Sequence, residues 1–263
     1  VVYAHFFTNA FIAVGALKKL NKPIFAAIGE YYHIDVRRAY YKTDFYNKNL
    51  KIISGYIAVS PQIEEKLLSL GIEKSRILMK PNGVDFNHFY QRDKNEMRKK
   101  YNLPLDKKIV IFVGRFYKDK GPQYLLKAVE SLKNVAVIFV GAGEEELIGD
   151  KIIFKDKVPS ALVPELLSAA DVFCLPTLHE GSCNAILEAM ACGLPIVSSD
   201  IPEIHVQCDP SFSRLVNPLD VGEIIYDDLK LIEMSKYAIK FSKKFNLNER
   251  AKDILQFVGK GLI

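Results

Sequence analysis

The sequence contains little cysteine, and none of it in the arrangement of a metal site. Its four cysteines, in a chain of 263 residues, lie within apolar stretches and form no C-x2-C pair. A structural zinc site needs closely spaced thiolates or imidazoles, and a disulfide scaffold needs a short secreted chain dense in cysteine. The sequence therefore disfavours both a zinc site and a disulfide scaffold. The pattern favours reduced thiols in a cytoplasmic protein.

Long hydrophobic runs are also absent. A transmembrane helix needs about 18 or more consecutive apolar residues, whereas Lys18 and Lys19 end the run that begins at Phe6. This run has the pattern of a buried helix. No basic segment of a signal peptide precedes the strand-like run from Val1 to His5. We therefore expect the sequence to begin in the middle of a domain.

Charge of one sign is not concentrated in the sequence either. The chain has 36 Lys and Arg against 31 Asp and Glu, a net charge of +5. With 49% hydrophobic residues and a mean hydropathy of +0.05, the composition is that of an ordinary globular protein. The weak positive balance favours an anionic small molecule or an anionic surface, with a merely solvated surface as the alternative. It argues against a nucleic-acid partner.

Three nucleotide-binding motifs are missing. No G-x4-G-K-[ST] occurs, which excludes a P-loop NTPase. Gly141-Ala142-Gly143 begins like a dinucleotide fingerprint, but Glu146 stands where the third glycine belongs, so a Rossmann dehydrogenase is disfavoured. No Asp-x-Asp occurs to hold a divalent metal against a nucleotide diphosphate. We therefore expect no obligatory metal and no other cofactor.

Short β-rich runs alternate with amphipathic helical patterns, which is typical of βαβ units around a parallel sheet. The expected strands are residues 1–5, 24–28, 55–59, 76–79, 109–113, 135–140, 172–175 and 195–198. The expected helices include residues 61–70, 122–132, 161–169, 184–191 and 249–258. The succession Pro81-Asn82-Gly83 breaks the pattern and predicts a domain boundary near residues 83–90.

The first candidate site is the loop from Gly114 to Gly121, between a clear strand and a helix with Pro122 at its first position. Ligands of doubly wound sheets bind at the carboxyl ends of strands, where this loop lies. Arg115 and Lys120 could both approach a phosphate there, beside the N-terminus of the following helix. The alternative is a solvated loop with two charged side chains.

The second candidate site is the run from Glu180 to Glu188, again between a strand and a helix. Gly181 allows a ligand to approach the backbone closely, over the amides near Ser182 to Asn184. The carboxylates of Glu180 and Glu188 flank these amides and could accept hydrogen bonds from the hydroxyl groups of a ribose and a sugar. The alternative is a capping residue and a solvent-facing helix residue.

Together these segments resemble family 4 retaining glycosyltransferases of the GT-B fold. The resemblance rests on five motifs in the family's order and is densest from residue 55 to 217. They are Ala58-Val59-Ser60-Pro61; Pro81-Asn82-Gly83-Val84-Asp85; Gly114-Arg115 with Lys120-Gly121; Val140-Gly141-Ala142-Gly143; and Glu180-Gly181 followed by Glu188-Ala189-Met190-Ala191-Cys192-Gly193-Leu194-Pro195-Ile196-Val197.

The resemblance implies a role for each motif residue. Arg115 and Lys120 would hold the donor diphosphate and steady the leaving group, which agrees with positive charge aimed at a departing phosphate. Glu188 would hold the ribose hydroxyls, and Glu180 would lie near the transferred sugar, so that Arg115, Lys120 and Glu180 form the catalytic set. The expected donor contacts are Gly114, Gly181, Ser182, Cys183, Asn184, Ala185 and Glu188.

Two departures from the family pattern concern the first domain. The family's opening strand and glycine-rich loop do not precede Val1, so the chain resembles an N-terminally truncated member. The family's His-Gly after the second strand is replaced by Ile28-Gly29-Glu30. His33 is a candidate substitute for that histidine. His5 is a further candidate, with a buried or hydrogen-bonded structural histidine as its alternative. His179 beside Glu180 is another.

The predicted architecture is therefore α/β of the GT-B type, with two Rossmann-like doubly wound domains, the first incomplete. The predicted parts are an acceptor-side domain at residues 1–85, a donor-side domain at 86–245, and a C-terminal helix at 246–263 that crosses back to the first domain. The predicted function is metal-independent, retaining transfer of a hexosyl-type group from a nucleoside-diphosphate sugar to a hydroxyl, in polysaccharide or glycolipid synthesis. The alternative is a non-catalytic module that binds a nucleotide sugar or a partner.

The predicted acceptor is a saccharide or a lipid-linked molecule, met in the cytoplasm or at the inner membrane face. Aromatic and basic residues gather between residues 31 and 51, which suits peripheral contact with anionic lipid. The alternative is that the tyrosines pack in the core and the cations are solvated. The residues are Tyr31, Tyr32, Tyr40, Tyr41, Phe45, Tyr46, Arg37, Arg38, Lys42, Lys48 and Lys51.

Overall fold

The structure, a computed structural model, describes residues 1–17, 20, 22–29, 31, 34, 43–217 and 228–261. These residues form two compact units. One comprises residues 1–83 and 247–263, and the other comprises residues 84–246. Each unit is built on its own parallel sheet.

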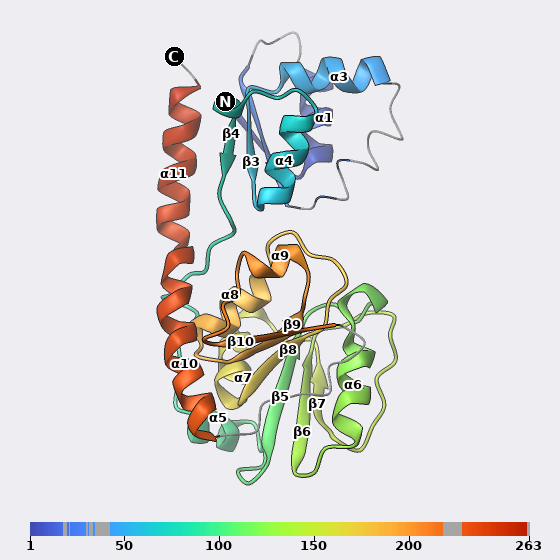
Figure 1. Cartoon of the computed structure of the whole chain (residues 1–263), viewed down its shortest axis with the longest axis vertical. Coiled ribbons are helices and arrows are strands. Elements are labelled where there is room, and N and C mark those ends of the chain that lie inside the picture. The colour runs from blue at the N-terminus through green and yellow to red at the C-terminus, as the bar shows by residue number, and fades with distance from the viewer. Residues whose placement is uncertain are drawn as a thin grey trace. The chain divides into compact units, whose positions relative to one another are not determined.

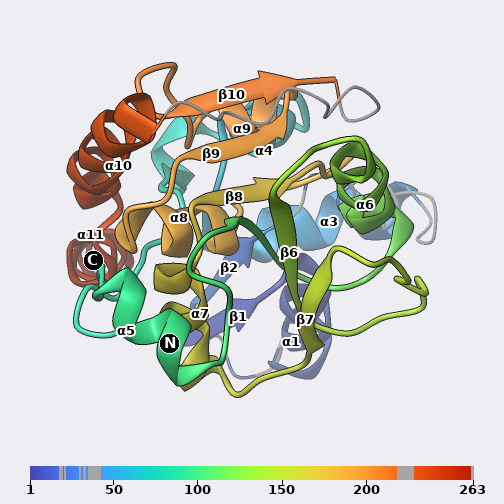
Figure 2. The ribbon, with the colours of Figure 1, turned by 90° about the horizontal axis from the view of Figure 1, so that it is seen from below.

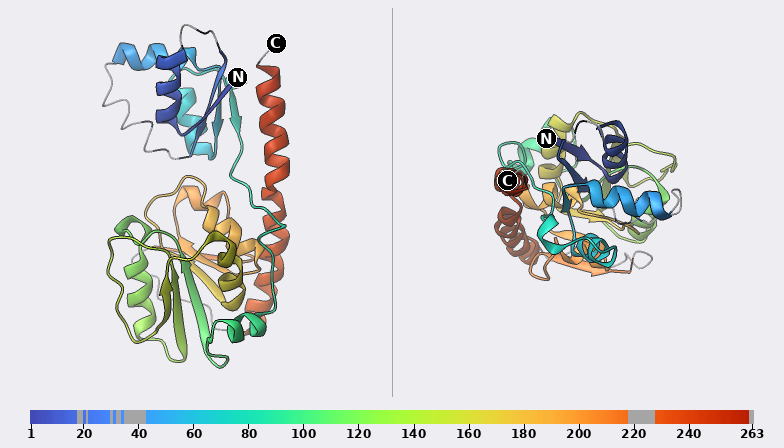
Figure 3. Two further views of the ribbon diagram at one scale, coloured as in Figure 1. Left: turned by 180° about the vertical axis from the view of Figure 1, so that it is seen from behind. Right: turned by 90° about the horizontal axis from the view of Figure 1, so that it is seen from above.

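The first unit contains a four-stranded sheet with the strand order β1-β2-β3-β4. All of its described pairings are parallel, which agrees with the expected βαβ pattern. Figures 1 and 3 show α1, α3 and α4 on one face of this sheet and α11 on the other. The strands are β1 (Val2–His5), β2 (Ile24–Ile28), β3 (Gly55–Ala58) and β4 (Ile77–Met79), and the helices are α1 (Phe7–Leu17), α3 (Thr43–Ile52), α4 (Pro61–Ser69) and α11 (Leu247–Lys260).

Strand β2 shows why both faces of this sheet are covered. All five of its residues are apolar and buried, and successive side chains of a strand point to opposite faces. Ile24, Ala26 and Ile28 join the core under α1, α3 and α4. Phe25 and Ala27 join a smaller core with Ile254 of α11. The continuous apolar run therefore corresponds to a central strand buried on both sides.

The second unit contains a six-stranded parallel sheet with the order β10-β9-β8-β5-β6-β7. Figure 2 shows α6 on one face of this sheet and α7 and α8 on the other, as in a doubly wound fold. The strands are β5 (Lys108–Val113), β6 (Val135–Val140), β7 (Ile152–Asp156), β8 (Val172–Leu175), β9 (Ile196–Ser199) and β10 (Ser213–Val216). The helices are α5 (Lys94–Lys100), α6 (Pro122–Glu130), α7 (Val163–Ala169), α8 (Asn184–Ala191), α9 (Pro202–His205) and α10 (Asp228–Ser242).

The strand order reverses beside β5. From β5 the chain moves outward through β6 to β7, and then returns to place β8 on the other side of β5. The connections at such a switch point lie on opposite faces of the sheet and leave a crevice at the carboxyl ends of the two strands. The loops that follow β5 and β8 are therefore the positions at which the fold prepares a ligand site.

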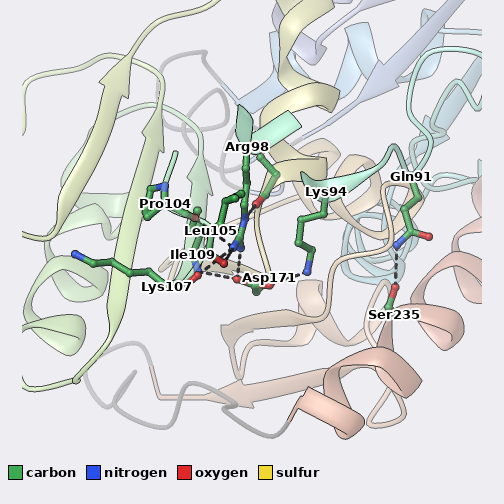
Figure 4. Close-up of polar contacts among 10 residues, drawn as sticks. Gln91, Lys94, Arg98, Pro104, Leu105, Lys107, Ile109, Asp171 and Ser235 are labelled. Carbon is green, nitrogen blue, oxygen red and sulfur yellow. Dashed lines mark hydrogen bonds and ion pairs between the residues drawn. The ribbon is translucent and has the colours of Figure 1, made fainter. Parts of the chain in front are cut away.

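An ion-pair network around the buried Asp171 lies at the amino ends of the strands of this sheet, opposite the loops after β5 and β8. Arg98 Nη2 lies 2.6 Å from Asp171 Oδ2, Lys94 Nζ lies 2.6 Å from Oδ1, and the N–H of Ile109 donates to Oδ2 (Figure 4). Arg98 also donates to several backbone carbonyls, including that of Ala169. Burial would raise the pKa of Asp171, but Lys94, the Ile109 amide and Arg98 together lower it. The network therefore joins α5 to the amino ends of β5 and β8 as an ionised cluster.

All eight expected strands and all five expected helices are present to within a few residues. The buried helix expected after Phe6 is α1. The prediction of an α/β fold with parallel sheets is thus confirmed. It omitted β7 and β10, the two edge strands of the larger sheet.

Candidate active site

Two loops meet at the carboxyl ends of β5 and β8. The first runs from Gly114 through a 3-10 turn at Lys118–Lys120 to Gly121, the residue before α6. The second runs from Pro176 to Cys183, the residue before α8. Both loops end at a helix N-terminus, where unpaired N–H groups and the helix dipole favour an anion. Both sequence-predicted site segments therefore lie at the switch point of one sheet.

An ion pair joins the two loops. Lys120 Nζ lies 2.8 Å from Glu180 Oε1 and donates a second hydrogen bond of 2.9 Å to the carbonyl of His179. The Lys120 and Glu180 side chains are only 17% and 13% exposed. In such a partly desolvated place the attraction between charges exceeds that of a surface pair. The two residues proposed for diphosphate and sugar are thus brought into contact with each other.

Backbone packing fixes the separation of these loops. The Thr177 hydroxyl donates to the carbonyls of Asp119 and His179, at 3.1 and 3.0 Å. The N–H of Leu178 donates to the carbonyl of Asp119 at 2.7 Å. Gly121 has φ +69°, and a Cβ there would lie 2.2 Å from the Pro176 carbonyl oxygen. A side chain at position 121 would therefore push the two loops apart.

The Gly141-Ala142-Gly143 run has a packing role. Gly141 has φ +146°, and a Cβ there would lie 1.8 Å from the Gly114 carbonyl oxygen. The N–H of Phe116 donates to the carbonyl of Ala142 at 2.9 Å. The two glycines thus let the loop after β6 pack directly on the backbone of the loop after β5. Their presence is explained without a bound dinucleotide.

The N-terminus of α8 has an unusual cap. Cys183 occupies the N-cap position, and its side chain makes no capping hydrogen bond. Instead, the N–H of Cys183 donates to Gln207 Oε1 at 2.7 Å, and Gln207 Nε2 donates to the Cys183 carbonyl at 3.2 Å. The Cys183 amide, expected to face the donor, is therefore already hydrogen-bonded inside the protein. Burial, and then the Glu180 carboxylate, raise the pKa of the Cys183 thiol, so it remains a neutral apolar group.

Glu188 lies in α8, one turn beyond the capped end. Burial raises the pKa of its carboxyl to about 7. In the part of the chain that the structure describes, no cation is paired with this carboxylate. A half-buried carboxylate without a counterion is well suited to accept hydrogen bonds from neutral hydroxyl groups.

The other predicted donor contacts differ in accessibility. Arg115 is exposed, with its guanidinium carbon 5.3 Å from the centre of the Tyr117 ring. Gly181 and Ser182 are buried, whereas Asn184 is exposed and begins α8. Gly114, which precedes Arg115, and Ala185, which follows Asn184, are half-buried. Arg115 could therefore reach a ligand from the surface, whereas Lys120 is held in place by Glu180 and the His179 carbonyl.

The candidate histidines have different outcomes. His179 is exposed, and it is its carbonyl that takes part in the Lys120 contacts. His5 ends β1 and is exposed, with its ring centre 4.5 Å from that of Phe6. The buried form of the structural alternative for His5 is therefore wrong. His33 lies outside the described residues.

The predicted membrane segment is only partly described. Tyr46 is fully buried, stacks on Phe11 at 5.4 Å between ring centres, and donates to the Ile34 carbonyl. Its placement in a membrane-facing patch is therefore wrong, because packing in the core removes it from the surface. Tyr31, Lys48 and Lys51 are exposed. The structure does not describe residues 32, 37, 38 and 40–42 or the side chain of residue 45.

Cavities lie at both ends of the strands in the described part of the second unit. One of about 280 Å³ lies beside the first loop and the start of α6. Another, of about 360 Å³, includes Lys94, Lys108 and Asp171 in its lining and so lies at the amino ends of the strands. It is therefore remote from the Lys120–Glu180 pair, and we do not assign it to the same site. The described residues include no group of three or more His, Cys, Asp or Glu side chains that could hold a metal ion.

None of the helices that the structure describes has the length and apolar character needed to cross a membrane.

Sequence reasoning missed two residues that shape this site. Thr177 is fully buried and ties together the loops that carry Lys120 and Glu180. Gln207 is 1% exposed and holds the cap of α8 from a position 24 residues away. A polar residue within apolar sequence was the available signal for both, but their partners are backbone groups, which leave no mark in the sequence.

Comparison with known proteins identifies the family of the chain. A family model described as "Glycosyl transferases group 1" matches residues 93–244. TuaC of Bacillus subtilis, named as a candidate teichuronic acid biosynthesis glycosyltransferase, is 34% identical over 150 residues, which are 55% of this chain and 38% of TuaC. A D-inositol 3-phosphate glycosyltransferase of Mycolicibacterium smegmatis is 29% identical over 185 residues, which are 64% of this chain and 43% of that protein. The chain thus spans less than half the length of these two relatives.

Solved structures share the fold of nearly the whole chain. Sucrose-phosphate synthase from Thermosynechococcus elongatus matches with a TM-score of 0.83 and 21% identity, over 98% of this chain and 72% of that chain. Anabaena Alr3699/HepE in complex with UDP and glucose matches with a TM-score of 0.80 and 16% identity, over 98% and 77%. These likenesses confirm the predicted GT-B fold.

Proposed function

The chain belongs to the glycosyl transferases group 1 family, and on that premise we propose that it moves a sugar, with retention, from a nucleoside-diphosphate sugar to an acceptor hydroxyl. The observation that carries the proposal is the contact between Lys120 and Glu180 at the switch point of the sheet. It supports the proposal because a cation suited to a diphosphate and a carboxylate suited to a sugar lie together at the end of the sheet where such folds bind ligands.

Lys120 and Arg115 would bind the two phosphates. Lys120 supplies a fixed point charge, because Thr177 and the His179 carbonyl hold its loop and its ammonium group. Arg115 would supply a planar guanidinium from the surface. Charge aimed at a departing diphosphate stabilises the transition state more than the ground state, because negative charge grows on the leaving group.

Glu188 would bind the ribose. The nucleoside hydroxyls would donate hydrogen bonds to its carboxylate, which lacks a cationic partner among the described residues. The N–H groups at the start of α8 would meet the sugar and phosphate, with Gly181, Ser182, Asn184 and Ala185 as the proposed contacts.

The transfer itself needs no protein nucleophile. The acceptor oxygen would form a bond to the anomeric carbon on the face from which the diphosphate leaves, and its proton would pass to the departing phosphate oxygen. Cys183 is unsuited to attack because its thiol is buried and its pKa is raised. The ion pair of Glu180 with Lys120 supports a role in orienting charge and not in forming a covalent intermediate.

Calorimetric titration with UDP, GDP and ADP and their glucose derivatives tests the proposal directly. Because the fold is shared with a protein solved with UDP and glucose, UDP-glucose is the first probe. Lys120→Ala and Arg115→Ala should each weaken binding by about 1.5 to 3 kcal/mol, the scale of a hydrogen bond to a charged group. Lys118→Ala, in the same turn but with an exposed side chain, is the matched control. Variants that bind as tightly as the parent would contradict the site.

Metal independence is part of the proposal. Lys120 and Arg115 would neutralise the diphosphate in place of a divalent cation. Binding of UDP-glucose should therefore persist in excess EDTA. Affinity that disappears on chelation and returns with Mg²⁺ would contradict it.

Turnover distinguishes an enzyme from a binding module. The relatives' names point to different acceptors, so we name only an acceptor hydroxyl. Release of UDP from UDP-glucose in the presence of lipid-linked or soluble saccharides would show transfer. Tight donor binding without any UDP release would favour the non-catalytic alternative.

Peripheral contact with anionic lipid stays a separate prediction. It now depends on the exposed Tyr31, Lys48 and Lys51 and on neighbours outside the described residues. Co-sedimentation with anionic liposomes should occur at low salt and fade at high salt. No binding by folded protein at low salt would favour an acceptor in solution.

A further inference from the structure

Gln207 replaces the side-chain cap that α8 lacks. A helix N-terminus is usually capped by Ser, Thr, Asp or Asn, whereas α8 begins after Cys183, whose thiol makes no capping bond. Instead, the Gln207 carboxamide accepts a hydrogen bond from the N–H of Cys183 and donates one to the carbonyl of Cys183. These two hydrogen bonds have opposite directions and engage both backbone groups of Cys183, so they hold the two successive peptide units that this residue joins.

The clamp lies between the residues that would bind the donor. Cys183 follows the Glu180 loop and directly precedes α8, which carries Glu188. Gln207 follows α9, the helix after the neighbouring strand β9. Gln207 itself is 1% exposed, so water cannot readily take over either of its hydrogen bonds.

We propose that Gln207 is a positioning residue for donor binding, which sets the orientation of the α8 N-terminus without touching the donor. The proposal rests on the proposed function, because it assumes that the donor meets this helix end. Loss of the clamp would let the peptide between the Glu180 loop and α8 rotate. The amides and Glu188 would then no longer match the phosphate and ribose at the same time.

Gln207→Met tests the clamp because it keeps the length and volume of the side chain and removes both hydrogen bonds. Gln91→Met is the matched control, since Gln91 bonds to Ser235 beside the cavity at the amino edge of the sheet. The Kd for UDP should rise about tenfold in Gln207→Met, the scale of two lost hydrogen bonds, and stay within twofold of the parent in Gln91→Met.

Gln207→Glu gives a readout that a merely structural role would not produce. A protonated carboxyl can accept from the Cys183 N–H and donate to the Cys183 carbonyl, as the carboxamide does. An ionised carboxylate cannot donate. UDP binding by Gln207→Glu should therefore recover relative to the parent as the pH falls from 8 to 5. A constant ratio between the two proteins over this range would overturn the proposal.

Amide hydrogen exchange in the free protein separates the clamp from the function. Exchange in peptides covering residues 180–187 should accelerate in Gln207→Met and not in Gln91→Met. Unchanged exchange would overturn the clamp, whatever the protein binds. Faster exchange with unchanged UDP affinity would overturn the positioning role. If the parent protein binds no nucleoside diphosphate at all, the proposed function is contradicted by the parent protein alone, independently of the Gln207 variants.

Discussion

Lys120 Nζ lies 2.8 Å from Glu180 Oε1, so the proposed diphosphate site of the free protein already contains a negative charge. A diphosphate that reaches Lys120 must compete with this carboxylate or rearrange it. The pair is mostly buried, so its attraction is only weakly screened by solvent. Glu180 would thus hold Lys120 in place before the donor arrives, and its carboxylate would meet the sugar once the phosphates take over the ammonium group.

Glu180→Gln should separate these two roles. The amide keeps the shape of the side chain but removes the charge that competes for Lys120. Affinity for UDP, which carries no sugar, should rise several-fold, whereas the rate of sugar transfer should fall. Calorimetry with UDP and a UDP-release assay measure the two effects.

Glu249→Gln provides the control for that substitution. Lys252 Nζ lies 2.7 Å from Glu249 Oε1, but both side chains are more than 60% exposed. The same change there should alter neither UDP affinity nor transfer. Weaker UDP binding by Glu180→Gln would contradict the competition and would assign Glu180 to holding the loop alone.

Glu188 predicts a pH dependence with a definite sign. Its carboxyl has a usual pKa of 4.5, which burial raises to about 7 in the folded chain. The folded state therefore binds the proton more tightly than the unfolded state. The stabilisation this provides is complete below about pH 4.5 and is lost as the pH rises through 7. Glu188→Gln should remove this pH dependence, which urea unfolding at pH 5 and pH 8 would measure.

The same carboxyl should make nucleotide binding depend on pH in the opposite direction. Ribose hydroxyls donate to the ionised form, so UDP affinity should increase between pH 6 and pH 8. The comparison of parent and Glu188→Gln isolates this effect from titration of the phosphates. Pyrophosphate, which has no ribose, should bind the two proteins equally well. Equal losses for UDP and pyrophosphate would contradict the ribose assignment.

Thr177 should act through the loops that it joins. Thr177→Val keeps the shape of the side chain and removes the hydroxyl that donates to the Asp119 and His179 carbonyls. The Asp119 and His179 carbonyls keep the hydrogen bonds from the Leu178 N–H and from Lys120. The loss at this fully buried position should therefore cost about 0.5 to 1.5 kcal/mol of the free energy of unfolding, the net worth of a hydrogen bond, and UDP affinity should fall. Thr177→Ser should restore both. A valine variant with the stability and UDP affinity of the parent would contradict this role.

The central strands could be predicted from sequence because they are buried on both faces. Val135–Val140, for example, is a continuous apolar run that becomes the fully buried β6. The missed strands β7 and β10 lie at the two edges of the sheet, and their sequences, IIFKD and SRLV, contain charged residues. Edge strands need only one buried face and one bonded neighbour, so their composition differs little from that of loops.

The charged residues of the candidate site could also be selected from the sequence, because charges beside glycine at the end of an apolar strand are a local signal. The arrangement that joins them was not. The Lys120–Glu180 contact spans 60 residues, and the Arg98–Asp171 pair spans 73. Gln207 acts on the backbone of Cys183, and any residue type except proline at position 183 would offer the same two groups. Contacts between residues so far apart in the chain depend on the order of the strands in the sheet, which could not be predicted from the sequence.

Gly141 allows the loops after β5 and β6 to pack against each other beneath the candidate site. Gly141→Ala would place a methyl group 1.8 Å from the Gly114 carbonyl oxygen, at a φ of +146° that side chains rarely adopt. The loops after β5 and β6 would have to separate, at a cost of about 3 kcal/mol or more. Gly15→Ala is the control, since Gly15 lies in α1 with no atom within 4 Å of its added Cβ, and it should stabilise the chain by about 0.5 to 1 kcal/mol. Thermal unfolding followed by circular dichroism should therefore shift to lower temperature in the first variant and not in the second. An unchanged transition in Gly141→Ala would show that the loops can separate freely, and the glycine run would then need a ligand to explain it.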